Sequence, residues 1–385
     1  MDLRGKQRFF LSVFYFLSGF CFSSWASRIP TIKAEFEFNE AELGTILLFM
    51  PFSSLCGIPI SGWLVSRYDS RVPLTFAFVF LAVAIFGIGM ATSTVALIAS
   101  ICLFAFSMRI LNISMNTQAV GLQKLYEKRI NGSFHGLWST GGIVGVGFST
   151  LLVGMKTDIS VHLTVVALIT LAVTFISFSN LIKNDRTTSG NKLNLRKPDP
   201  YIMYLGLLVL FASICEGGMF DWGGVYFREV VKVELFTLGY LLFMVCMAIS
   251  RFASDRVIES IGLARTYILS SSLIIIGITL SVLFATFWTS LIGFCFVGFG
   301  TASIFPMTLL LAGSSKKYSP GMGISIVATY GIVGMFVGPA LIGYLAHAFN
   351  LRLAFIAFGI AGLMLIPISQ LFFKHQKREP EEKMV

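Results

Sequence analysis

The sequence has few charged residues for its length. Charged residues make up 12% of its 385 positions, hydrophobic residues make up 56%, and the mean hydropathy is +0.82. A soluble domain carries about 25% charged residues, which cover the surface that faces water. This chain lacks the residues for such a surface, so we expect lipid to surround most of it.

Motifs for enzymatic chemistry are also missing. The sequence contains no P-loop, no HExxH and no nucleophile elbow. The six cysteines lie in apolar segments without a CxxC spacing, which indicates neither a disulfide framework nor a metal site. We therefore expect no enzyme, no cofactor and no metal, and a proton gradient as the source of energy.

Long apolar runs occupy most of the chain. A membrane-spanning helix needs about 20 mostly apolar residues, and twelve segments reach that length. They cover residues 8–27, 43–66, 72–91, 95–121, 132–154, 160–181, 201–228, 236–258, 264–285, 288–313, 321–348 and 351–373. The pattern predicts an all-α membrane protein with 12 transmembrane helices in two six-helix pseudo-repeated bundles.

The basic residues are distributed unevenly between the loops. Of the 29 lysines and arginines, 22 fall on the side that holds both termini, six fall on the other side, and Arg109 falls inside a span. Cytoplasmic loops carry an excess of Lys and Arg, so both termini are expected to be cytoplasmic. The net charge of +10 is thereby explained by topology, and we expect no nucleic-acid partner.

The two halves of the chain resemble each other. TGGIVGVGFSTLLVG begins at Thr140 and TYGIVGMFVGPALIG begins at Thr329, an offset of 189 residues. The polar stretch 183–200 separates an N-terminal bundle, 1–182, from a C-terminal bundle, 201–385. Glycines of both segments are expected to let helices pack closely, and Pro306 and Pro339 are expected to kink late spans. Repeated six-span halves are typical of one transporter architecture.

A loop motif after the second predicted span resembles the signature of a transporter family. GWLVSRYDSR, Gly62 to Arg71, resembles the cytoplasmic signature G-x-L-x-D-R-x-G-R-R of the major facilitator superfamily, with Ser66 at the usual Asp position. The second half keeps the Asp-Arg pair as Asp255 and Arg256. The resemblance implies that this loop holds one conformation closed through charge pairs, which assigns Arg67, Asp255 and Arg256 to gating.

Four further motifs narrow the resemblance. WASRIPTIKAEFEFNEAELG, MNTQAV, SFHGLWSTGG and EGGMFDWGGVYFRE resemble the YbjJ-like branch, which is related to fucose–proton symporters. The resemblance implies a secondary active transporter of a bacterial inner membrane that works by alternating access. We expect proton-coupled uptake of a small polar solute, such as a sugar or sugar derivative, by a monomer in the lipid bilayer.

Polar residues in the fourth span are candidates for solute binding. Arg109, Asn112 and Asn116 follow one another at spacings of three and four, so they share one helical face. A guanidinium and two amides suit a solute rich in hydroxyls or bearing a carboxylate. The alternative is structural: the arginine pairs with an acid on a neighbouring helix, and the amides tie helices together.

The seventh span carries two acids, Glu216 and Asp221. In a regular helix they diverge by roughly 140°, but Gly217 and Gly218 are expected to break the helix, as is common at transporter sites. Burial favours the protonated form of a carboxyl group, so Glu216 is the first candidate for carrying a proton and also for contacting substrate. Its alternative is a permanent salt bridge to Arg109. Asp221 is assigned to proton coupling, with gating or structural pairing as the alternatives.

Aromatic residues complete the predicted site. His135 opens the fifth span, where it can relay protons or make a helix-end contact. Trp138, three residues on, can stack on a sugar or sit at the membrane interface. Trp222 is the third aromatic candidate, for substrate binding.

Two arginines near the outer surface are assigned to gating. Arg28 follows the first span and is expected to pair with an acid of the segment 35–42 or to remain solvated. Arg228 ends the seventh span.

Two further functions fit the same composition. Phe-rich walls can line a greasy pocket, so a proton-driven exporter of amphipathic compounds is the alternative to uptake. A transporter-like sensor is a more distant one.

Overall fold

The computed structural model of the protein describes residues 3–127, 130–183, 199–315, 317–318 and 320–378. It describes the backbone but not the side chains of residues 131, 132, 255, 320, 321, 377 and 378. Over these residues the chain is helical and has no strand. Twelve helical segments are long and apolar enough to cross a membrane, which confirms the predicted fold class.

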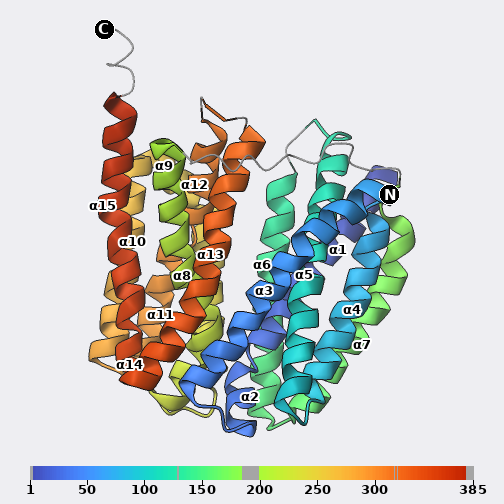
Figure 1. The fold of residues 1–385 in the computed structure, drawn as a ribbon, viewed down its shortest axis with the longest axis horizontal. Helices are drawn as coiled ribbons and strands as arrows, with labels where there is room; N and C mark the ends of the chain where they lie inside the picture. The colour runs from blue at the N-terminus through green and yellow to red at the C-terminus, as the bar shows by residue number, and fades with distance from the viewer. Residues whose placement is uncertain (1–2, 128–129, 184–198, 316, 319, 379–385) are drawn as a thin grey trace. The chain divides into compact units, whose positions relative to one another are not determined.

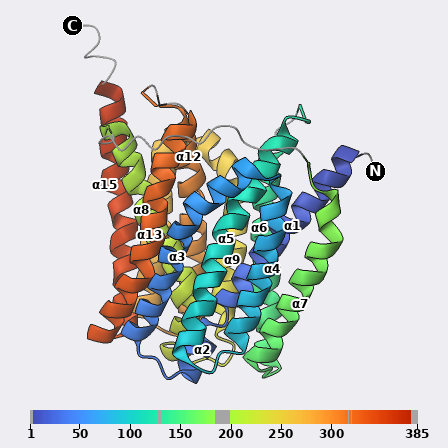
Figure 2. The ribbon, with the colours of Figure 1, turned by 45° about the vertical axis from the view of Figure 1, so that its right-hand side comes forward.

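The N-terminal half contains six spans. Its helices are α1 (Leu3–Ala26), α2 (Ile29–Glu35), α3 (Glu40–Arg67), α4 (Arg71–Gly89), α5 (Thr94–Gln123), α6 (Asn131–Gly154), α7 (Ile159–Ser177) and the short η1 (Phe178–Asn180). Within this half α1 packs along α6, and α4 packs against both α5 and α7 (Figures 1 and 2).

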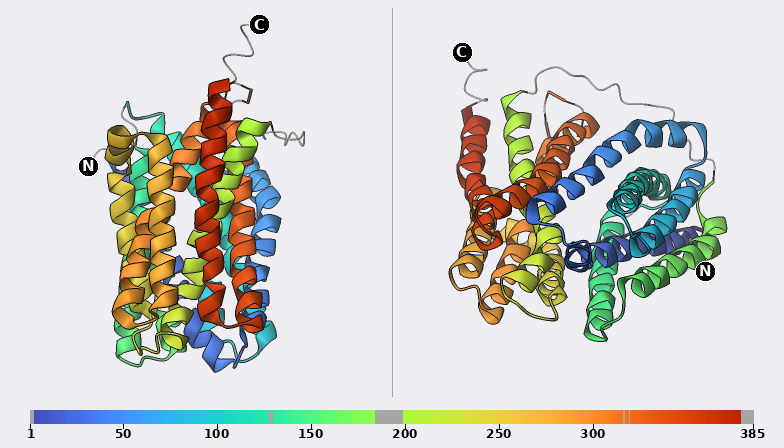
Figure 3. Two further views of the ribbon diagram at one scale, coloured as in Figure 1. Left: turned by 90° about the vertical axis from the view of Figure 1, so that its left-hand side faces the viewer. Right: turned by 60° about the horizontal axis from the view of Figure 1, so that its bottom comes forward.

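The C-terminal half also contains six spans. Its helices are α8 (Pro200–Glu229), α9 (Thr237–Ile261), α10 (Leu263–Leu283), α11 (Phe287–Thr301), α12 (Ile304–Gly313), α13 (Pro320–Ala348), α14 (Leu351–Ala354) and α15 (Ile356–Arg378). Here α8 packs along α13, and α10 packs against α15, the red helix of Figure 3.

Contacts group the chain into two compact units. One unit contains residues 1–37 and 46–191, and the other contains residues 38–45 and 192–385. The first residues of α3 thus group with the second unit, where a Cβ added to Gly44 would lie 3.1 Å from the Cα of Gly343 on α13. Thr45 and Tyr344 hydrogen bond through their hydroxyls at 3.0 Å. The predicted linker, 183–200, lies mostly outside the described residues, so this boundary stays a prediction.

Glycines hold the two main helix crossings together at equivalent positions of the repeat. A Cβ added to Gly145 on α6 would lie 2.6 Å from the Phe20 carbonyl oxygen on α1. Gly334, 189 residues later on α13, meets the Leu210 carbonyl oxygen of α8 in the same way. Each crossing therefore needs a residue without a side chain, as expected for closely packed membrane helices.

Proline explains why one of the predicted spans is interrupted. The predicted span 288–313 is divided into α11 and α12 at Ala302 and Ser303. Pro306 lies four residues after Ala302, and its ring clashes with a helical carbonyl at that position. Pro339 remains inside a continuous α13.

Candidate functional site

Arg109 is held in the N-terminal unit by α3. Its Nε donates a hydrogen bond to Ser54 Oγ at 2.9 Å, and the side chain is half-buried. The aliphatic stem passes close to Gly57, where an added Cβ would lie 3.1 Å from Cβ and Cγ of Arg109. Among the described residues no carboxylate forms an ion pair with this guanidinium. Sequence reasoning missed Ser54 and Gly57, since serine and glycine are too common in membrane helices to give a signal.

The two asparagines lie next to each other on α5, as their spacing predicts. Tyr15 donates its hydroxyl to Asn116 Oδ1 at 2.9 Å, and Asn116 Nδ2 donates to Asn112 Oδ1 at 3.2 Å. In this chain of hydrogen bonds each amide oxygen accepts one hydrogen bond and keeps one lone pair. The Asn112 Nδ2 group is a donor without a partner among the described residues, and its side chain is exposed.

The two aromatic candidates of α6 lie in the same unit. His135 is exposed, and its ring centroid lies 5.8 Å from that of Tyr15. Trp138 is half-buried beside Phe22, with ring centroids 5.9 Å apart. Tyr15 thus contacts both Asn116 of α5 and His135 of α6, so it links two of the predicted site residues of this unit.

Glu216 on α8 forms an ion pair that the sequence did not predict. Its Oε1 accepts a hydrogen bond from Arg251 Nη2 at 3.0 Å, in an ion pair whose side chains are 11% and 29% exposed respectively. The predicted span 236–258 contains Arg251, although the loop count included it with the basic residues of the cytoplasmic side; in the structure it lies inside α9. Within its own unit the salt-bridge partner of Glu216 is therefore Arg251. The alternative pairing with Arg109, which lies in the other unit, stays a prediction.

Asp221 differs from Glu216 in having no partner among the described residues. Its carboxylate forms no hydrogen bond or ion pair with any described residue, and its side chain is half-buried. The expected helix break is wrong, because α8 runs without interruption through Gly217 and Gly218. These glycines serve packing: added Cβ atoms would contact Met335 and Phe358.

Trp222 is a packing residue. The side chain is fully buried, and its Nε1 donates to the Pro339 carbonyl oxygen at 3.0 Å. The ring therefore lies between α8 and α13, and its single polar atom is already satisfied. That it binds substrate stays a prediction, because an amphipathic aromatic gives the same sequence signal in a packing role and in a binding role.

Arg28 has hydrogen-bond partners that the sequence did not predict. Its Nε donates to His162 Nδ1 at 2.9 Å and its Nη2 donates to the Thr157 carbonyl oxygen at 3.1 Å. Arg28 is 3% exposed and His162 is fully buried. Glu35, an acid of the expected segment, also attracts the Arg28 guanidinium electrostatically, so the hydrogen bonds to His162 of α7 and to Thr157 before it add to the expected partner.

The signature loop of the first half contains one short-range charge pair. Asp69 lies 3.8 Å from Arg71, and the guanidinium of Arg67 lies 6.0 Å from the ring centroid of Trp63. Ser66, at the usual Asp position, donates its hydroxyl to the Trp63 carbonyl oxygen at 2.8 Å.

The remaining gating candidates are less constrained. Arg256 is exposed on α9, and the side chain of Asp255 lies outside the described residues. Arg228 places its guanidinium 5.4 Å from the ring centroid of Phe236. The gating assignments of all five residues stay predictions.

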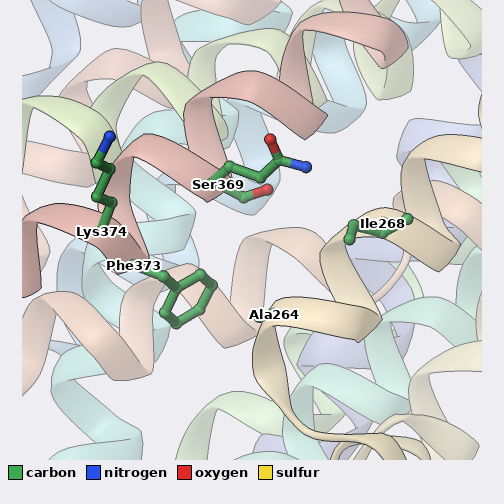
Figure 4. A pocket seen from close by; sticks show the side chains of 6 residues that line it. Ala264, Ile268, Ser369, Phe373 and Lys374 are labelled. Carbon is green, nitrogen blue, oxygen red and sulfur yellow. The ribbon is translucent and has the colours of Figure 1, made fainter. Parts of the chain in front are cut away.

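One surface pocket lies between α10 and α15 (Figure 4). Its volume is about 300 Å³, and its lining residues are Ala264, Ile268, Ser369, Gln370, Phe373 and Lys374. None of the predicted site residues lines it. Over the described part of the chain, no group of three or more His, Cys, Asp or Glu side chains can hold a metal ion.

Family comparison decides the class of protein. The sequence matches the family model of the Major Facilitator Superfamily over residues 9–277 and 240–384. The chain belongs to the Major Facilitator Superfamily. It is therefore a multi-pass membrane transporter of a small molecule rather than an enzyme.

Individual relatives agree with this assignment. An uncharacterised MFS-type transporter of Yersinia pestis is 28% identical over 92% of this chain and 92% of its own length. The membrane protein MosC of Rhizobium meliloti is 28% identical over 95% and 90% of the two chains. The fold is similar to that of the nucleoside transporter NupG, with a TM-score of 0.75 at 12% identity over 97% of this chain and 100% of that one. A bacterial homologue of the human lysosomal transporter Spinster gives a TM-score of 0.74 at 14% identity over 95% and 96%.

Proposed function

We propose that the protein is a secondary active transporter that takes up a small polar solute, such as a sugar or sugar derivative, together with protons. The observation that carries the proposal is the Glu216–Arg251 ion pair, a 3.0 Å contact between two helices that are long and apolar enough to span a membrane. Ionisable groups in membrane-spanning helices are costly to insert and are retained mainly where they are used.

The pair provides a way to couple protons to conformation. A proton on Glu216 removes the negative charge that holds Arg251, so the hydrogen bond weakens and the guanidinium becomes available to other acceptors. Loss of the proton restores the pair. A site that alternates between these states can bias the two conformations of an alternating-access cycle differently.

Asp221 provides a second candidate group for proton transfer. Because it has no partner among the described residues, neutralising it breaks no contact. His135, exposed beside Tyr15, is a candidate relay in the other unit. We assign the solute-binding role to Arg109, Asn112, Asn116 and Trp138.

The setting follows the loop charges and the sequence resemblance. We propose a bacterial inner membrane location with both termini in the cytoplasm, and a monomeric working unit within the YbjJ-like branch. The 22 basic residues counted on one side include Arg251, which lies within α9, and the asymmetry without it still supports this orientation.

Uptake into proteoliposomes tests the proposal. An inward proton gradient is expected to drive accumulation of at least one member of a panel of sugars and sugar derivatives in the wild type. Glu216→Gln is expected to abolish accumulation above the equilibrium level. Glu259→Gln is the matched control, since Glu259 is an exposed acid near the end of α9. Uptake that does not depend on the proton gradient, or accumulation by Glu216→Gln above the equilibrium level, would contradict proton coupling through this residue.

A further inference from the structure

Three arginines that are buried or half-buried differ in their partners. Arg251 has a carboxylate partner, and Arg28 donates to a histidine nitrogen and a backbone carbonyl. Among the described residues, Arg109 has only the Ser54 hydroxyl, which receives its Nε–H. A hydroxyl accepts a hydrogen bond but does not neutralise a charge.

The geometry leaves most of the Arg109 guanidinium uncommitted. A guanidinium has five N–H donors, and one of them is used by Ser54. The four N–H groups of the two terminal nitrogens form the planar edge that matches a carboxylate in a two-pronged contact. The Arg109 stem is fixed against Gly57, so this edge is oriented before any ligand arrives.

The neighbouring amides add donors and few acceptors. Asn116 Oδ1 accepts from Tyr15 and Asn112 Oδ1 accepts from Asn116, so each amide oxygen keeps one of its two lone pairs. Against these two lone pairs, α5 offers the four N–H groups of the Arg109 edge and the two Asn112 amide hydrogens. A neutral sugar hydroxyl donates as well as accepts and needs acceptors in return, whereas a carboxylate only accepts. The free groups of this face therefore favour an anion over a neutral polyol.

An arginine at a helix centre costs about 2.5–3.5 kcal/mol on insertion scales. No carboxylate among the described residues neutralises the Arg109 charge. A bound anion is therefore the group that can offset the free-energy cost of placing this charge in the membrane. From this donor-rich face we infer that the transported solute carries a carboxylate, which Arg109 binds with its two terminal nitrogens and Asn112 assists. This inference rests on the proposed function, since it names the class of the solute.

Ligand-induced thermal shift of the purified protein tests this inference. The probes are matched pairs at constant ionic strength and pH: D-glucuronate with D-glucose, D-galacturonate with D-galactose, and D-gluconate with D-glucitol. A specific ligand raises the melting temperature by mass action. The variants are Arg109→Gln and Arg109→Lys, which keeps the charge but not the planar edge. Lys6→Gln is the control, because it removes one exposed positive charge at the start of α1.

At least one acid is expected to raise the melting temperature of the wild type and of Lys6→Gln, while its neutral counterpart does not. The shift is expected to vanish in Arg109→Gln and to be several-fold weaker in Arg109→Lys. A neutral sugar that stabilises as well as its acid, an acid shift that persists in Arg109→Gln, or no acid-selective shift across the panel would overturn the inference.

The same probes separate this inference from the proposed function. Gradient-driven uptake of a neutral sugar that is unchanged in Arg109→Gln would contradict the inference that the solute carries a carboxylate, and it would leave the proposal of proton-coupled transport intact. Binding of an acid that depends on Arg109 but gives no gradient-driven uptake would support a carboxylate-bearing solute and contradict proton coupling.

Discussion

The two halves of the molecule share a scaffold. Gly145 on α6 lies against the Phe20 carbonyl of α1, and Gly334 on α13 lies against the Leu210 carbonyl of α8. About one turn earlier the glycine comes from different helices in the two halves: Gly141 of α6 faces Phe16 of α1, whereas Gly206 of α8 faces the Tyr330 ring of α13. At this second position the repeat therefore preserves the close approach of the two helices but not the helix that supplies the glycine.

Their charges differ in a way that the scaffold does not require. The N-terminal unit holds a guanidinium with a neutral partner, Arg109 with Ser54, and the C-terminal unit holds a neutralised pair, Arg251 with Glu216. A repeated fold can thus assign different chemistry to its halves. In our account one half supplies the charge that binds the solute and the other supplies the group that responds to protons.

The largest effect is expected where the halves are alike. Gly145→Val and Gly334→Val each force a side chain against a backbone carbonyl, and overpacking of this kind costs about 1–3 kcal/mol or more. Both variants are expected to lower the melting temperature in detergent, measured by fluorescence-detected gel filtration. Gly147→Val is the control, because an added Cβ there meets nothing within 4 Å. Destabilisation by only one of the two glycine variants would break the equivalence of the crossings.

A smaller effect is expected at the partner of Arg109. Ser54→Ala removes the acceptor of the Nε–H, and a hydrogen bond to a charged group contributes about 1.5–3 kcal/mol. Part of this is recovered by rearrangement, so solute affinity in a direct binding assay is expected to fall about tenfold. The neighbouring Ser53→Ala is the matched control, since Ser53 donates to the Cys102 carbonyl at 2.6 Å and not to Arg109. Equal losses in both variants would show that α3 packing, and not Arg109, sets the affinity.

The smallest effect is expected at Gly57. Gly57→Ala places a methyl group 3.1 Å from the Arg109 stem, so the stem must shift by a few tenths of an ångström. We expect solute affinity to fall two- to threefold, about 0.5 kcal/mol, with no change in Glu216-dependent coupling. Loss of coupling in this variant would contradict the division of roles between the halves.

Hydropathy and the repeat were sufficient to predict the fold. Spans could be placed because a bilayer imposes a minimum apolar length, and the 189-residue offset located Gly145 and Gly334 as equivalent positions. Sequence spacing also placed Asn112 and Asn116 on one face, because the helix period is fixed.

Partners across helices could not be predicted in the same way. Arg251 falls within the predicted span 236–258, but nothing in the sequence indicated that Glu216 of α8 is its partner. The pair Gly217 and Gly218 suggested a broken helix, but packing against Met335 and Phe358 keeps α8 regular. Such contacts depend on how helices cross, and one sequence carries little information about crossing geometry.

The central claim is that Arg109 is kept for a ligand whereas Arg251 is kept for Glu216, and thermal unfolding without any ligand tests it most directly. Arg251→Gln leaves Glu216 unpaired, which is expected to cost about 1.5–3 kcal/mol and to lower the melting temperature by several degrees, with partial recovery in the Glu216→Gln/Arg251→Gln double variant. Arg109→Gln removes an uncompensated charge and is expected to leave the melting temperature unchanged or to raise it. A loss of stability in Arg109→Gln as large as that in Arg251→Gln would show that Arg109 is a structural residue and would contradict the account.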